Sequence, residues 1–205
     1  MTTERDRTPV EGSDFRGEDW YAEDLGAAQF AECTFTDVDL SEATTRGATF
    51  AGCTFAGVRF NASAHVSTSF VASTFRRCNL FGATFEGCKL SGATFSECTL
   101  RPVTVVGGQW SGVTIRGGAL TRVDLTGLDL READLSLSDL TGAVLRDCRL
   151  DGATLRDTTL HEADLRGASL DRVDLAAARL RRTRLDLAGG VLLAELHGAD
   201  VDVSV

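Results

Sequence analysis

The chain has 205 residues, 43% of them hydrophobic, and a formal charge of −9. This composition allows one folded domain with a sizeable core. The acidic balance argues against direct nucleic-acid binding, which requires a basic surface, and no apolar run approaches the roughly 20 residues that span a bilayer. We therefore expect a soluble, cytoplasmic protein that contacts neither nucleic acid nor membrane.

The chain begins with a charged and polar segment, residues 1–12. It has no apolar stretch of the kind found in a secretory signal peptide. We expect this segment to be flexible and to precede the folded domain.

From Phe15 to Leu185, every fifth residue is apolar, with few exceptions. These residues, here called the centres of the repeat, occupy thirty-five positions in one register. Only Thr45 and His65 among them are not plainly apolar. A small residue commonly stands two positions before each centre, and glycine is common two positions after it.

A period of five is incompatible with an amphipathic helix, because an α-helix would distribute such residues around its whole circumference. It also differs from the period of two in a strand. The pattern fits a chain in which two inward residues are followed by a corner, where glycine tolerates the required backbone angles. Four corners make a square coil of 20 residues. Residues 13–185 thus predict an all-β solenoid, a quadrilateral β-helix of about nine coils.

Stepping through the chain by 20 residues gives the side chains that stack on each other. Phenylalanines fill the columns of the N-terminal coils and leucines those of the C-terminal coils. We therefore expect the two halves to differ in corner geometry. Thr45 and His65 fall one coil apart on the same side, which favours a hydrogen-bonded inward pair over a ligand or catalytic role for the histidine.

Residues 186–205 leave the register and predict a C-terminal cap and dimerisation module, since a solenoid must cover its open end. A short helix ending at Gly198 is expected, followed by a strand-like alternation over residues 199–203. The apolar residues exceed what one short cap needs, which indicates a twofold dimer contact. The predicted dimerisation residues are Leu187, Val191, Leu192, Leu193 and Leu196.

Charge is distributed unevenly: residues 1–42 carry a net −9, residues 43–123 a net +6 and residues 124–205 a net −6. The position just before each centre points outward, and aspartate is frequent there. These carboxylates either form a solvated face or imitate nucleic-acid phosphates toward a basic partner. The predicted partner-binding residues are Asp14, Asp19, Asp24, Asp39, Asp124, Asp129, Asp134, Asp139, Asp164 and Asp174.

All six cysteines occupy the small inward column, as core fillers. Cys33 and Cys53 lie one coil apart, as do Cys78 and Cys98, at a spacing that permits a disulfide. We expect free thiols, because the chain is expected to be cytoplasmic. No phosphate loop, nucleophile elbow or metal-binding spacing is present, so no catalytic residue, metal or cofactor is predicted, and we expect no enzyme activity.

The repeat resembles the pentapeptide-repeat family, as residues 83–87 (ATFEG) and 163–167 (ADLRG) illustrate. The resemblance covers residues 13–185 and implies a right-handed solenoid. A more specific similarity is to the mycobacterial fluoroquinolone-resistance proteins of this family. It is carried by residues 46–55, residues 98–105 and the C-terminal segment, residues 186–205. The related plasmid-borne quinolone-resistance proteins carry inserted loops, and none interrupts the register here.

Members of this group form rod-like dimers that imitate B-form DNA and engage DNA gyrase. The resemblance thus implies a homodimeric gyrase-binding protein, a partial DNA mimic that modulates gyrase and confers resistance to fluoroquinolones or another topoisomerase poison. Topoisomerase IV is the alternative target. The net-positive middle departs from the pattern and limits mimicry to the acidic coils. The other interpretation is a scaffold or interaction module with no topoisomerase partner.

Overall fold

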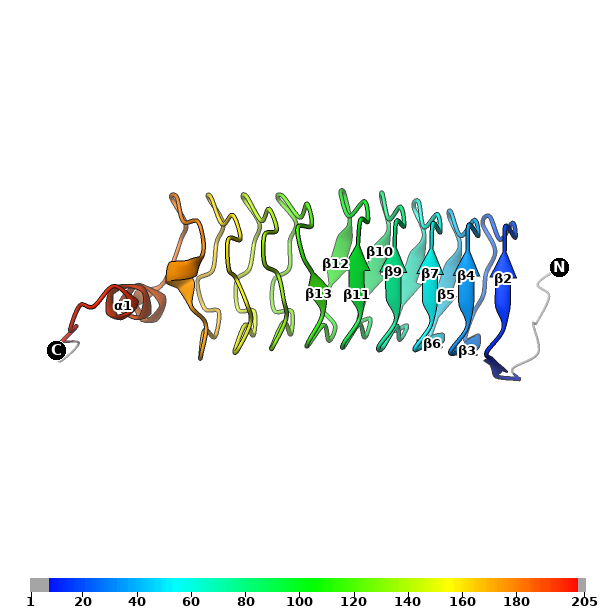
Figure 1. Ribbon diagram of the computed structural model, residues 1–205, viewed down its shortest axis with the longest axis horizontal. Coiled ribbons are helices and arrows are strands. Elements are labelled where there is room, and N and C mark those ends of the chain that lie inside the picture. Colours follow the sequence, from blue (N-terminus) through cyan, green and yellow to red (C-terminus); the bar gives the residue numbers. More distant parts are fainter. Residues whose placement is uncertain (1–7, 203–205) are drawn as a thin grey trace.

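The computed structural model describes residues 8–202, which form a straight rod of stacked coils (Figure 1). Phe15 pairs with Phe35, and Phe35 with Phe55, so one coil contains 20 residues. Backbone hydrogen bonds join adjacent coils from the Gly12 N–Ala31 O bond to the Leu165 N–Arg184 O bond. These two bonds are each 2.9 Å long. The ladder passes through the whole repeat without an inserted loop.

Three sides of the rod contain short parallel strands. The six-stranded face has the order β13-β11-β9-β7-β4-β2, the four-stranded face β12-β10-β8-β5 and the three-stranded face β1-β3-β6. On the fourth side, here called the bridge face, isolated bridges connect Asp19, Asp39, Arg59, Asn79 and Thr99.

The thirteen strands of the described residues are β1 Val10–Glu11, β2 Asp14–Arg16, β3 Gln29–Ala31, β4 Thr34–Thr36, β5 Thr44–Arg46, β6 Thr49–Ala51, β7 Thr54–Ala56, β8 Ala64–Val66, β9 Thr74–Arg76, β10 Thr84–Glu86, β11 Thr94–Ser96, β12 Thr104–Val106 and β13 Thr114–Ile115. A 3₁₀ helix, η1, spans Leu175–Ala177, and one α-helix, α1, spans Leu187–Leu196.

The predicted quadrilateral β-helix is confirmed, but the expected nine coils are not all built from strands. The strands extend only from residue 10 to residue 115, about five turns of 20 residues. Beyond Ile115, single bridges such as Asp129 with Arg149 and Asp164 with Arg184 continue the stack. The ladder also begins before residue 13, because β1 pairs with β3; residues 1–7 lie outside the described part of the chain.

The corners place one residue in the left-handed region of backbone conformation, as the recurring glycines predict. Gly87 has a φ of 60° and Gly167 a φ of 76°. Arg77, Glu132 and Leu137 adopt the same conformation, with φ values of 52°, 56° and 64°. Repetition of the coil therefore imposes this angle even where a side chain makes it unfavourable.

The two halves differ in corner geometry, as expected from their core residues. Many Phe-centred units of the N-terminal half form a three-residue strand followed by a bend. From Leu120 to residue 172, each corner is instead a tight turn, closed by bonds such as Leu128 N to Leu125 O at 3.0 Å.

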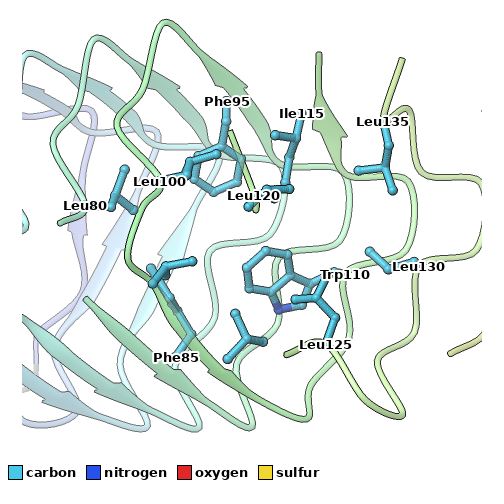
Figure 2. A pocket seen from close by; sticks show the side chains of 12 residues that line it. Leu80, Phe85, Phe95, Leu100, Trp110, Ile115, Leu120, Leu125, Leu130 and Leu135 are labelled. Atoms are coloured by element: carbon cyan, nitrogen blue, oxygen red, sulfur yellow. The ribbon is translucent and has the colours of Figure 1, made fainter. Parts of the chain in front are cut away.

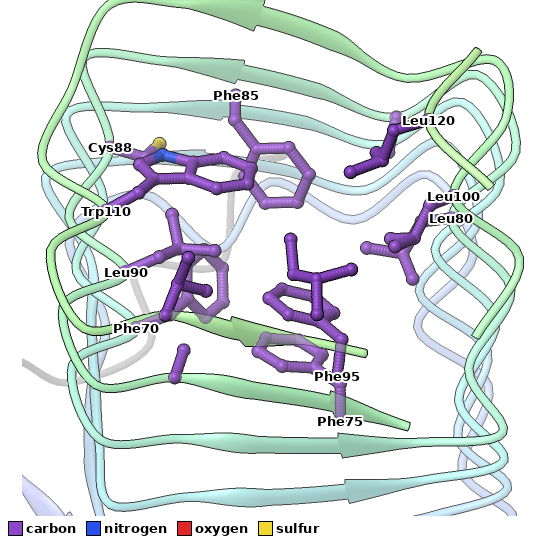
Figure 3. Packing of buried hydrophobic residues seen from close by; sticks show 14 of the residues in the cluster. Phe70, Phe75, Leu80, Phe85, Cys88, Leu90, Phe95, Leu100, Trp110 and Leu120 are labelled. Atoms are coloured by element: carbon purple, nitrogen blue, oxygen red, sulfur yellow. The ribbon is translucent and has the colours of Figure 1, made fainter. Parts of the chain in front are cut away.

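Aromatic rings fill the N-terminal interior in stacked columns. Phe55 and Phe75 stack with 4.8 Å between ring centroids. Phe75 and Phe95, seen in Figure 3, stack with 4.5 Å between ring centroids. In the C-terminal half, leucines occupy the same columns, and Leu140, Leu145 and Leu150 are fully buried. The rod thus has one continuous apolar core, which explains why a single register of apolar residues runs through the repeat.

A small cavity lies where the aromatic columns give way to aliphatic ones. Phe95, Trp110 and Ile115 are among its lining residues, and its volume is about 10 Å³ (Figure 2). A cavity of that size accommodates about one water molecule. The change from rings to branched chains therefore leaves the core almost completely filled.

The C-terminal end of the stack is covered by α1, as predicted. The site of a Cβ on Gly189 would lie 3.3 Å from Leu185 Cδ2 and 3.5 Å from Leu170 Cδ1, so the helix backbone rests directly on the last coil. Gly198 follows the helix with a φ of 84°. The strand expected after it is absent from residues 199–202. Among the described helices, none has the length and apolarity needed to cross a membrane.

Candidate functional site

The first coil presents three exposed carboxylates on three different faces. Asp14 lies on the six-stranded face, Asp19 on the bridge face and Asp24 beside the four-stranded face. Asp19 Oδ1 accepts a hydrogen bond of 3.1 Å from Tyr21 N, and Asp24 Oδ1 one of 3.0 Å from Gly26 N. These short-range bonds fix Asp19 and Asp24 while leaving them accessible to a partner.

Asp39 stands one coil above Asp19 and is partly neutralised. Arg59 Nη2 donates to Asp39 Oδ2 at 2.9 Å. Burial acts to raise the pKa of Asp39, but hydrogen bonds from Arg59 and Ser41 outweigh it and lower the pKa to about 2. On this face the negative surface therefore weakens after the first coil.

Four of the aspartates predicted to point outward, Asp124, Asp129, Asp134 and Asp139, belong to one C-terminal coil and are not equivalent. Asp124 and Asp139 are exposed, whereas Asp134 is half-buried and lies 3.6 Å from Arg116 Nε. Asp129 is only 8% exposed, and Arg131 binds it through two nitrogens at 2.7 and 2.8 Å. The expectation that the carboxylate before each centre is open to a partner is therefore wrong at Asp129.

Asp164 is likewise covered, with 7% of its surface exposed. Arg166 donates two hydrogen bonds to it, at 2.7 and 2.8 Å, and these lower the pKa of Asp164 to about 2. Arg146 and Arg184 lie 3.7 and 3.9 Å away. Asp164 thus forms the centre of an arginine cluster rather than part of an acidic surface. Asp174 is exposed and caps η1 by accepting from Ala177 N at 3.2 Å.

The sequence contains the information that identifies these covered carboxylates. Arg131 and Arg166 each follow their aspartate by two residues, and Arg149 and Arg184 follow by 20, one coil later. Both relations bring an arginine beside the carboxylate on the outer surface. Charge counted along the sequence overlooks this pairing, because it ignores the neighbours that stacking creates.

The middle of the rod has a basic surface, in contrast to the acidic first coil. Arg76, at the end of β9 on the six-stranded face, is exposed, as are Arg77 at the next corner and Arg101, two residues after the bridge-face residue Thr99. Phe81 is 54% exposed and Tyr21, three coils earlier in the same column, is 53% exposed. The positive charge seen in the sequence is therefore available on the surface, accompanied by the exposed ring of Phe81.

The residues predicted to dimerise separate into two groups on α1. Leu192 and Leu193 pack against the core, whereas Leu187 is 77% exposed and Leu196 41% exposed. Val191 is half-buried. The cap thus uses part of the helix and leaves Leu187, in the first turn, and Leu196, in the last turn on the opposite side of the helix, facing solvent.

Thr45 and His65 form the predicted inward hydrogen-bonded pair, with both residues 2% exposed. Burial lowers the pKa of His65 to about 3, so the imidazole is neutral at physiological pH. Over residues 8–202, no cluster of three His, Cys, Asp or Glu side chains has the arrangement of a metal site. The larger surface grooves are open and charged, as shown by the groove of about 700 Å³ beside Arg122, Glu162 and Arg182.

Comparison with known proteins identifies the repeat. The model of the pentapeptide repeat region matches residues 23–104, and the model of pentapeptide repeats in eight copies matches residues 119–157 and 148–186. No curated protein matches the chain.

Among solved structures, a trypsin-treated variant of QnrB1, a plasmid-mediated fluoroquinolone resistance protein, is similar with a TM-score of 0.74 and 19% identity. The similarity covers 95% of this chain and all of that one. Full-length QnrB1 gives a TM-score of 0.65 at 19% identity, over 94% of this chain and all of that one. With its 20-residue square coils and its matches to both repeat models, the chain belongs to the pentapeptide-repeat family.

Proposed function

We propose that this protein binds DNA gyrase, modulates its activity and confers resistance to fluoroquinolones or a related topoisomerase poison. It acts by binding, not by catalysis. The observation that carries the proposal is the similarity of the rod to the trypsin-treated QnrB1 variant, with a TM-score of 0.74 over 95% of this chain. The similarity to mycobacterial resistance proteins in residues 46–55 and 98–105 supports the same assignment.

The surface that resembles DNA is confined to the exposed acidic coils. Asp14, Asp19 and Asp24 project from the first coil, and Asp124 and Asp139 from a later one. A groove that binds DNA carries positive charge and attracts such carboxylates as it attracts phosphates. Asp129 and Asp164 contribute little, since arginines cover them.

We further propose that two chains associate through α1. Leu187 and Leu196 remain accessible after the helix has capped the stack. Contact between two such helices around a twofold axis would double the rod and place an acidic first coil at each end. Replacing Leu187 and Leu196 by Asp should convert the dimer to a monomer in sedimentation equilibrium, with Glu195→Gln and Asp200→Asn as the surface control. A wild-type monomer would refute this arrangement.

The decisive experiment is plasmid supercoiling by gyrase with increasing protein, with and without a fluoroquinolone. We expect inhibition of supercoiling, or fewer drug-stabilised cleavage complexes. Asp19→Asn with Asp24→Asn should weaken the effect, since Asn retains the turn hydrogen bonds and removes the charge. Glu86→Gln with Glu97→Gln, in the basic middle, is the charge-matched control. The effect should also decrease with salt, because exposed charges act partly by steering.

A scaffold or interaction module without a topoisomerase partner is the second candidate. It is favoured by the basic middle of the rod and by the ion-paired state of Asp129 and Asp164, neither of which suits a uniform imitation of DNA. Absence of any effect on both gyrase and topoisomerase IV would support it. An effect on topoisomerase IV alone would change the target and leave the proposed mode of action.

A further inference from the structure

Cys78 and Cys98 lie side by side in adjacent coils. Thr99 N donates to Cys78 O at 2.9 Å, and residues 79 and 99 form a bridge. The two thiols also have matching hydrogen bonds, from Cys78 Sγ to Phe55 O at 3.3 Å and from Cys98 Sγ to Phe75 O at 3.5 Å. Since Phe55 pairs directly with Phe75, both side chains have the same orientation on neighbouring coils.

Cys98 differs from the other five cysteines in its exposure. It is half-buried, whereas the other five are buried. The next coil carries Gly118 in the same column, and this residue has no side chain that could cover the sulfur. A Cβ at Gly118 would approach Ile115 Cγ2, so the local packing has no room for one. The stack therefore leaves Cys98 more accessible to a small reagent than the other five cysteines.

The two neighbouring thiols are also chemically unequal. The Cys78 side chain lowers the pKa of Cys98, whereas the Cys98 side chain and burial raise the pKa of Cys78. Cys98 thus ionises first, and the thiolate is the form that reacts with oxidants. Cys78 is the neighbouring thiol that can then attack an oxidised sulfur.

The chain contains a control pair in the same geometric relation. Cys33 and Cys53 are also one coil apart in an inward column, and their exposures are 1% and 0%. Burial raises the pKa of the Cys53 thiol to about 12. This pair has the spacing of Cys78 and Cys98, but both of its cysteines are buried, so a difference in reactivity between the pairs reports on access to the thiol.

We propose that Cys98 and Cys78 are a peroxide-reactive pair that closes to a disulfide between adjacent coils. The Cys98 thiolate attacks one oxygen of hydrogen peroxide, forming the S–O bond of a sulfenic acid as the O–O bond breaks and hydroxide leaves as water. Cys78 then loses its proton and attacks the Cys98 sulfur, forming the S–S bond as the S–O bond breaks and a second water leaves. Two thiols lose two electrons, and peroxide is reduced to two waters.

The geometry of the stack is compatible with this product. Adjacent strands lie about 4.8 Å apart, and a disulfide accepts Cα separations of about 4.4–6.8 Å. The link would join two coils that hydrogen bonds already hold in register. The inference is independent of the proposed gyrase partner, because the reaction requires only the chain and peroxide.

The test uses the full-length reduced protein treated with hydrogen peroxide. We expect loss of two of the six thiols and a peptide cross-link between residues 78 and 98 on non-reducing mass spectrometry. Cys98→Ala should slow thiol loss by at least about tenfold. Cys78→Ala should leave a sulfenic acid on Cys98 that dimedone traps. Alanine suits this column, where it occurs naturally, and thermal melting of each variant verifies folding.

Cys33→Ala is the matched control and should react like the wild type. Equal thiol loss in Cys98→Ala, equally fast formation of a Cys33–Cys53 link, or a wild-type sulfenic acid that never resolves to a disulfide would each overturn the proposal.

Discussion

Thr45 Oγ1 lies 2.8 Å from His65 Nδ1 on the next coil, inside the core. Ser63 Oγ donates to Phe60 O at 2.8 Å and therefore accepts from His65 Nε2, 3.0 Å away. This leaves Nδ1 as the acceptor for Thr45, so the imidazole is neutral with its proton on Nε2. The ring stacks on Phe85 at 5.3 Å. His65 is thus accommodated between Thr45 and Phe85 in the buried column because both of its ring nitrogens have hydrogen-bond partners.

His65 should make stability depend on pH. Its pKa is about 3 in the folded state and 6.5 in the unfolded chain. The unfolded state therefore binds the extra proton between these values, and stability should fall as pH decreases from about 6.5 toward 3, by up to about 1.4 kcal/mol per pH unit from this group.

The variant His65→Phe should remove this contribution. Thr45 retains its bond to Thr68, and Ser63 its bond to Phe60 O, so neither hydroxyl is left alone. Denaturant unfolding at several pH values would compare the slopes, with His197→Phe as the exposed control. Equal slopes for wild type and His65→Phe would contradict the assignment.

Leu145→Asp should destabilise the rod by several kcal/mol. Leu145 is 0% exposed, and a carboxylate there would have no partner in the apolar interior. Thr99→Asp adds the same charge at an exposed position just before a centre and should change stability by less than about 0.5 kcal/mol. Thermal melting compares the two; similar midpoints would show that the inward register is wrong.

Asp186 should control the attachment of the C-terminal cap. Its two carboxylate oxygens accept from Gly189 N at 2.9 Å and from Gly167 N at 2.8 Å, so one side chain both caps α1 and ties it to the stack. Asp186→Ala should cost about 1–2 kcal/mol, and Asp186→Asn less, because one oxygen remains.

Hydrogen exchange at the amides of α1 measures this local stability. The hydrogen bonds from Gly189 and Gly167 lower the pKa of Asp186, so the contribution should be lost as pH falls below the ordinary carboxyl range. Protection of α1 that is unchanged in Asp186→Ala would show that apolar contacts alone hold the cap.

Arg166→Met should raise the pKa of Asp164 from about 2 toward its usual value. The two hydrogen bonds from Arg166 are the largest cause of the low pKa, and Arg146 and Arg184 are farther away. Carboxyl ¹³C chemical shifts during an NMR titration measure it directly. Arg156→Met, at an exposed position, is the control. An unchanged Asp164 titration would mean that the weaker ion pairs determine its charge.

The sequence determined the solenoid because every inward position along the repeat has the same physical requirement, a side chain that can be buried in the core. An apolar centre recurs every five residues, and side chains such as Phe75 and Leu145 are consequently 0% exposed. Even the exceptions, Thr45 and His65, could be paired by counting 20 residues, since stacking makes that separation a direct contact.

The outer surface was less predictable, because its properties depend on neighbours in three dimensions. Counting aspartates identified the exposed Asp19 and Asp24 but did not distinguish the arginine-covered Asp129 and Asp164. Nor did composition show that Leu192 packs on the core while Leu187 faces solvent. The core repeats one environment, so the periodicity of the sequence is enough to predict it. The charge and exposure of the outer surface depend on which side chains meet across coils and at the cap, and only the tertiary structure decides those contacts.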